Sequence, residues 1–109
     1  MQQRSEFRIV YPLPARPVAT IADRRFSALD VSEHAMRLDQ RHVPRPLVAG
    51  ERVAGRICLA QQVEHAFEGC VLRLESNAAV VLLDERFRID LSVIFQEQRY
   101  LRSRFPDWR

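Results

Sequence analysis

Two short groups of polar residues in the first third of the chain carry side chains that suit the binding of an anion. The first is an R-x-x-x-R sequence with Arg4 and Arg8 at its ends, and the second is a D-x-S sequence formed by Asp30 and Ser32. A guanidinium presents a planar fork of donors that matches phosphate oxygens and the edge of guanine. Asp and Ser supply a carboxylate acceptor and a hydroxyl, although both also stabilise turns after strands. These residues form a candidate site if the fold brings the two groups together.

The charge balance favours a small anion over a long nucleic acid. The chain of 109 residues has 17 basic and 14 acidic residues, a net charge of +3, and every basic residue is arginine. Proteins that bind DNA usually carry a strong basic stripe, so we expect no DNA partner. The length fits one domain. Residues 1–8 lack a secretory signal and no apolar run is long enough to span a membrane, so we predict a cytoplasmic protein without membrane insertion.

Metal binding and catalysis are not indicated by the residue pattern. Cys58 and Cys70 lie in apolar stretches without a C-x-x-C pair or a His-rich cluster, so we expect free thiols and no metal or other cofactor. Asp30, Ser32 and His34 are neighbours in the sequence, whereas a catalytic triad normally draws its members from separate segments. We therefore expect that the protein is not an enzyme.

The spacing of apolar residues predicts a mainly β fold. Residues 1–15 are polar or interrupted by proline, and we expect a tail or loop there. Residues 16–109 contain six short runs of β-branched or alternating apolar residues, at 18–22, 26–31, 36–38, 52–59, 66–74 and 78–83. Six short strands with brief polar connections indicate a six-stranded antiparallel β-barrel, whose closure removes exposed strand edges.

The end of the chain changes to a helical period. Between about residues 90 and 105, apolar side chains recur near helical spacing at Leu91, Ile94, Phe95, Leu101 and Phe105. Asp90 is the expected N-cap, and Pro106 ends the helix. We expect this C-terminal α-helix to pack its apolar side on the barrel.

In their order and context, the two polar groups resemble the signature of the PilZ domain family. That signature is R-x-x-x-R before the first strand, followed further along by [DN]-x-S-x-x-G, and residues 30–35 here read D-V-S-E-H-A. The stretch 50–57 looks like the family's central strand, and residues 96–106 look like the terminal helix of many members. The resemblance covers almost the whole chain. It implies a six-stranded barrel with a C-terminal helix that binds the bacterial second messenger cyclic di-GMP.

The resemblance assigns the first group of residues to a ligand-binding tail within residues 1–15. Arg4 and Arg8 would be the two loop arginines that hold the nucleotide. Gln3, which precedes Arg4, is included as a candidate contact. Ordering of the tail on binding would change its position, and that movement would serve as a signal.

The second group would complete the site. The resemblance implies that Asp30 and Ser32 form a polar pair that faces guanine, with His34 as a neighbouring candidate contact. Ala35 stands where the family has glycine. If the backbone there needs a positive φ, alanine costs roughly 1–2 kcal/mol and weakens binding. If the glycine only keeps the surface clear for the ligand, alanine is a mild change.

Three functions remain open from the sequence. The first is a cyclic di-GMP receptor that relays the messenger to a downstream protein partner. The second is a degenerate PilZ-like adaptor without nucleotide binding, which Ala35 would favour and for which Tyr100, Phe105 and Trp108 could supply an interface. The third is a small barrel that binds single-stranded RNA, but the expected strands carry few aromatic residues for stacking on bases.

Overall fold

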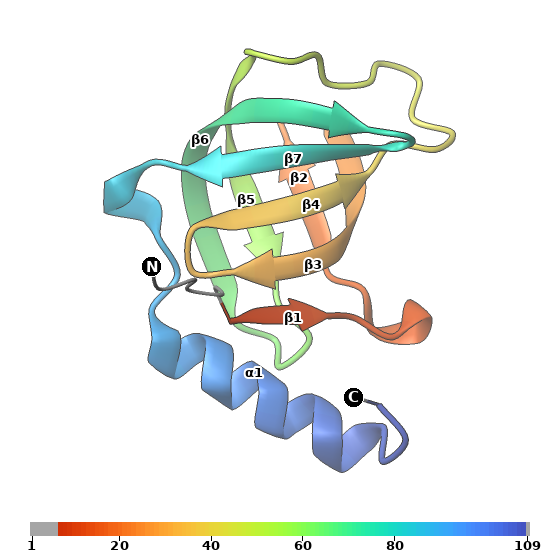
Figure 1. Cartoon of the computed structure of the whole chain (residues 1–109), viewed down its shortest axis with the longest axis vertical. Coiled ribbons are helices and arrows are strands. Elements are labelled where there is room, and N and C mark those ends of the chain that lie inside the picture. Colours follow the sequence, from red (N-terminus) through yellow and green to blue (C-terminus); the bar gives the residue numbers. More distant parts are fainter. Residues whose placement is uncertain (1–6, 109) are drawn as a thin grey trace, which may run out of the picture.

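The computed structural model describes residues 7–108, whose strands form a closed antiparallel barrel with a helix against one end (Figure 1). The elements are β1 (Arg8–Val10), the 3₁₀ helix η1 (Leu13–Ala15), β2 (Val18–Ile21), β3 (Arg24–Ser32), β4 (Ala35–Asp39), β5 (Arg52–Cys58), β6 (Glu64–Glu75), β7 (Ala78–Leu83), the 3₁₀ helix η2 (Glu85–Phe87) and α1 (Leu91–Arg104). Strands β3, β2, β5, β6, β7 and β4 pair in that order, and β4 pairs back with β3. The predicted six-stranded barrel and C-terminal helix are confirmed.

The described part of the chain has a further strand, β1, where the sequence analysis expected a loop. This strand pairs with the C-terminal part of β3 in the register Arg8↔Ser32 and Val10↔Asp30, and Ile9 between them is fully buried. The loop prediction for residues 1–15 is therefore wrong at β1. A three-residue strand is too short to show a period. It forms because β2 leaves this part of β3 unpaired: the pairing of β2 with β3 ends at Ser27.

Two glycines allow neighbouring strands of the barrel to approach closely. A Cβ added at Gly55 in β5 would lie 2.1 Å from the carbonyl oxygen of Thr20 in β2. A Cβ at Gly69 in β6 would lie 2.3 Å from the carbonyl oxygen of Leu82 in β7. Any larger residue would push these backbones apart, so the two glycines are required by the close approach of the strands.

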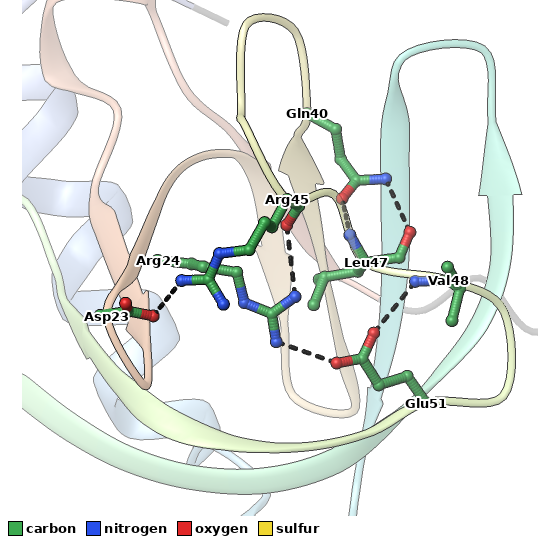
Figure 2. A network of polar contacts seen from close by, with 7 residues as sticks. All are labelled: Asp23, Arg24, Gln40, Arg45, Leu47, Val48 and Glu51. Carbon is green, nitrogen blue, oxygen red and sulfur yellow. Dashed lines mark hydrogen bonds and ion pairs between the residues drawn. The ribbon is translucent and has the colours of Figure 1, made fainter.

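The connection between β4 and β5 covers one end of the barrel and places a buried leucine there (Figure 2). The side chain of Gln40 bonds both backbone groups of Leu47, accepting from its N–H and donating to its carbonyl oxygen. Glu51 accepts from Arg24 Nη2 at 2.9 Å and from the backbone N–H of Val48 at 3.1 Å. Leu47 is 1% exposed, so these polar contacts hold an apolar side chain in the core.

Helix α1 lies next to β1, at the opposite end of the barrel from that connection (Figure 1). Ile94 and Leu101 are buried, as the helical period predicted. Leu91 and Phe95 are each 42% exposed, so their assignment to the packed face is wrong. Phe95 instead contacts the ring of Phe7, just before β1, with the ring centroids 5.3 Å apart. The packed face of α1 is narrower than the apolar pattern suggested.

A buried carboxylate takes the central position on that face. Glu97 is 1% exposed, and it accepts hydrogen bonds from the Tyr11 hydroxyl at 2.6 Å, the Ala60 N–H at 2.8 Å and the Gln61 N–H at 3.1 Å. Burial, together with the adjacent Glu97 charge, raises the pKa of Tyr11 far above its ordinary range, so the phenol remains a donor. Glu97 thereby ties α1 to the end of β1 and to the connection between β5 and β6.

Replacing Glu97 by alanine should destabilise the fold strongly. Glu97→Ala removes the shared acceptor of one buried and two part-buried donors, and each unsatisfied donor is costly, so we expect the free energy of unfolding to fall by about 3 kcal/mol. Urea denaturation monitored by circular dichroism measures this loss. Gln96→Ala, on the exposed side of the same helix turn, is the matched control and should change stability by no more than about 0.5 kcal/mol. Equal effects of the two substitutions would contradict the assigned role of Glu97.

Candidate functional site

The pairing of β1 with β3 brings the two polar sequence groups together. Arg8 is paired with Ser32, and Asp30 lies two residues earlier on the same strand, so all three side chains point to one face. That face borders a cavity of about 260 Å³ on the outside of the barrel. Five of the predicted site residues line it: Arg8, Asp30, Ser32, His34 and Ala35. Arg4 and Gln3, the other two, lie outside the described residues.

The remaining walls of this cavity come from residues that the sequence analysis did not select. Arg37 on β4 and Arg73 and Glu75 on β6 supply charge. An apolar surface is added by Leu72, Val80 and Leu82. Of these, only Arg37 had a local signal, because it follows Ala35 by two residues and so shares its face of the strand. The residues of β6 and β7 come from distant sequence and are brought here only by barrel closure.

Ser32 acts within the hairpin between β3 and β4. Its hydroxyl donates to the carbonyl oxygen of Ala35 and accepts from the N–H of the same residue, each at 3.2 Å. Ser32 is 3% exposed. These bonds close the turn that carries His34, in the way that Ser side chains commonly stabilise turns. The hydroxyl therefore shapes the cavity edge in this structure.

Asp30 is buried beneath a chain of alternating charges. Its carboxylate accepts from Arg37 Nε at 2.9 Å; Arg37 Nη1 also donates to Glu75 at 3.4 Å, and Glu75 accepts from Arg73 at 2.7 Å. Burial raises the pKa of Asp30 above its ordinary value, and the positive charges of Arg37 and Arg8 oppose that rise only in part. Ionisation of this carboxyl therefore carries a desolvation cost, and the neighbouring arginines offset part of that cost.

The backbone at Ala35 does not require glycine. Ala35 is the first residue of β4, pairs with Leu82 of β7, and is absent from the residues with positive φ in the described chain. Of the two explanations left open by the sequence, backbone strain is therefore excluded. Ala35 lines the cavity, so the consequence of its methyl group is confined to the space available to a ligand.

Comparison with known proteins now identifies the class of this barrel. The family model described as PilZ domain matches residues 2–102, and the chain belongs to that family. PilZ domains as a family bind cyclic di-GMP and act as binding or adaptor modules, so the protein is not an enzyme. No curated protein matches the sequence. In the described residues, no helix is long and apolar enough to cross a membrane, and no group of His, Cys, Asp and Glu side chains is arranged to hold a metal ion.

Neutralising Arg37 should raise the pKa of Asp30 further. Asp30 in the fold already holds its proton more tightly than in the unfolded chain, so stability falls as pH rises from the ordinary carboxyl pKa through the folded value. Arg37→Gln removes the largest opposing influence and should extend that fall to higher pH. Carboxyl ¹³C NMR titration measures the pKa, and urea denaturation across the same pH range measures the stability. Arg41→Gln, which removes an exposed partner of Asp39, is the control, and an Asp30 pKa equal in both variants would contradict this prediction.

Restoring the family's glycine should not stabilise the protein. Because Ala35 has ordinary strand geometry, Ala35→Gly relieves no strain and adds backbone entropy to the unfolded state. We expect the free energy of unfolding to fall by roughly 0.5–1 kcal/mol. Thermal denaturation provides the measurement. A higher melting temperature in the glycine variant would show that strain is present at this position after all.

Proposed function

We propose that this PilZ domain is a receptor for cyclic di-GMP that changes conformation on binding and relays the messenger to a protein partner. One observation carries the proposal: the β1–β3 register puts Arg8 of the R-x-x-x-R sequence beside the D-x-S sequence, on a single cavity. The same cavity holds two further arginines, Arg37 and Arg73. The family generally binds this nucleotide, which supports the choice of ligand. The cytoplasmic location stays a prediction.

The chemistry of the cavity suits a molecule with two phosphates and two guanines. Guanidinium groups can bind phosphate oxygens or the O6/N7 edge of guanine, and they can lie flat on a purine ring. The apolar surface of Leu72, Val80 and Leu82 can contact a base face. The volume of about 260 Å³ is below the roughly 300–1,000 Å³ of typical small-molecule sites, so part of the ligand would lie above the cavity. In this proposal, Arg4 and Gln3 contact that part.

Asp30 takes part through an exchange of partners. Arg37 already donates to one of its carboxylate oxygens, and Glu75 accepts from the same guanidinium. Guanine N–H groups that bind Asp30 would compete with Arg37, which can remain paired with Glu75. The exchange frees the Nε–H of Arg37 for a ligand phosphate, while its Nη1 keeps Glu75. The guanine N–H groups keep the buried carboxylate of Asp30 paired. Ser32 would hold the turn of the β3–β4 hairpin in place, and His34, in that turn, would contact the nucleotide.

The adaptor function without nucleotide is the alternative. Its sequence argument was the alanine at position 35, and the strand geometry at Ala35 removes the strain on which that argument depended. Trp108, one of the aromatic residues expected at an interface, donates instead to the carbonyl oxygen of Val10 within the fold. Tyr100 and Phe105 remain accessible along a separate cavity. Partner contacts are therefore compatible with either function, and nucleotide binding distinguishes them.

Isothermal titration calorimetry with cyclic di-GMP tests the receptor function. We expect saturable binding with a Kd at or below the micromolar range, and no comparable binding of GTP or cyclic di-AMP. Arg8→Ala removes a charge-assisted contact and should weaken binding by about 10- to 100-fold. The melting temperature should fall only slightly, because Arg37 still pairs with Asp30. Arg4→Ala combined with Arg8→Ala should abolish it.

Arg25→Ala is the matched control, because Arg25 is an exposed arginine of β3 at the end of the strand away from Ser32. It should leave the affinity unchanged. Absence of heat and of any thermal shift with the wild-type protein would reject the receptor function in favour of the adaptor. A loss of folding in Arg8→Ala would instead make that arginine structural.

A further inference from the structure

A second cavity lies at the C-terminal end of α1, and we call it the helix-end cavity. Its volume is about 380 Å³, larger than that of the candidate nucleotide site, with which it shares no lining residue. Its walls come from residues 14–18 between β1 and the start of β2, from residues 58–60 and 62 at the end of β5 and in the β5–β6 connection, and from the last turn of α1. The apolar part of the wall includes Pro14, Pro17, Leu59 and Phe105.

The charged residues of this cavity are all basic. Arg16 and Arg104 line it, and no Asp or Glu does so. The Nε atom of Arg16 is buried without a hydrogen-bond partner in the described structure, and its ion pair with Asp39 is long, at 4.0 Å. The Arg104 guanidinium lies over the Tyr100 ring, 5.1 Å from its centroid. A buried donor without an acceptor is unfavourable, so an anionic group that reached Arg16 would stabilise the fold. The apolar walls require that this anion be attached to an apolar body.

The walls of the helix-end cavity are attached to the strand that carries Arg8. Glu97 accepts from the N–H of Ala60, which lines one wall, from the N–H of the adjacent Gln61, and from the hydroxyl of Tyr11, which follows β1 directly. From Tyr11 the chain continues through η1 into the opposite wall, and prolines restrict the conformations of this short connection. A displacement of β1 would therefore be passed to both walls.

We propose that the helix-end cavity is the docking site for an acidic segment of the downstream protein partner. An apolar side chain of that segment fills the space between Pro17, Leu59 and Phe105, and its carboxylate binds Arg16 and Arg104. Charge complementarity selects the occupant, since two arginines and no acidic residue line the cavity. The identification of the occupant as a relay partner rests on the proposed receptor function, whereas the preference for an acidic apolar segment rests on the cavity alone.

Two peptides that differ only in charge test the proposal. The full chain, labelled with ¹⁵N, is titrated with the capped tetrapeptide acetyl-Asp-Leu-Phe-Glu-amide and with its neutral counterpart acetyl-Asn-Leu-Phe-Gln-amide. We expect saturable shifts of the backbone amides of residues 59–62 and 100–105 with the acidic peptide, and binding of the neutral peptide at least about 10-fold weaker. Arg16→Gln and Arg104→Gln should each weaken acidic-peptide binding by about 5- to 20-fold. Arg102→Gln, on the exposed side of the same helix, is the matched control and should have no effect.

Three results would overturn the docking site: equal binding of the two peptides, shifts that centre on Arg8 and Asp30, or no saturable shift up to about 5 mM peptide. Cyclic di-GMP is titrated into the same samples. If Arg16→Gln binds the nucleotide normally while no variant binds the peptide, the docking site fails and the receptor function stands. If the acidic peptide binds as expected but the nucleotide does not, the receptor function fails and the cavity remains a docking site of an adaptor.

Discussion

The carboxylate of Glu97 is the interaction on which the placement of β1 depends. β1 has only three residues and pairs along one edge, with β3, so its own ladder supplies few hydrogen bonds. A strand this short is held mainly by what covers it. Glu97 supplies that cover through Tyr11, and the contacts of Phe7 with Phe95 and of Val10 with Trp108 add to it. The position of Arg8, the first residue of β1, therefore depends on side chains near the other end of the chain.

The second constraint is the burial of Asp30 on the outer wall of the barrel. A desolvated carboxylate is tolerated only if cations accompany it, and Arg37 and Arg8 provide them. The arginines of the site thus have a structural task before any ligand arrives. A ligand that competes for Asp30 has to offer donors as good as a guanidinium, and one that competes for the arginines has to offer anionic oxygens. Guanine and phosphate meet these two requirements in one molecule.

Much of the fold could be predicted because local patterns carry it. The alternation around Val53 and Ile57 gave both the strand and its buried side. The other five barrel strands were predicted from short runs of β-branched or apolar residues. The remaining features depend on contacts that no local pattern records. Glu97 reads as a solvent-facing helix residue, and its burial is explained only by donors 36 to 86 residues away. Ser32 lines the candidate cavity, but its hydroxyl bonds the backbone of the turn, a local contact that the sequence motif does not record. Arg4 and Gln3 lie outside the described residues, so their roles remain predictions.

A shared carboxylate between two sites has a thermodynamic consequence. If nucleotide binding moves β1, it changes the geometry of Tyr11 and hence of the groups that Glu97 holds on the walls of the helix-end cavity. Coupling between two sites is reciprocal. A partner that favours one position of β1 must therefore change the affinity for the nucleotide by the same factor by which the nucleotide changes the affinity for the partner. A carboxylate with three fixed donors cannot follow such a movement gradually, because each bond weakens steeply with distance and angle. Any movement of β1 that a nucleotide caused would therefore break or re-form the bond from Tyr11, and that change in free energy would contribute to the coupling between the two sites.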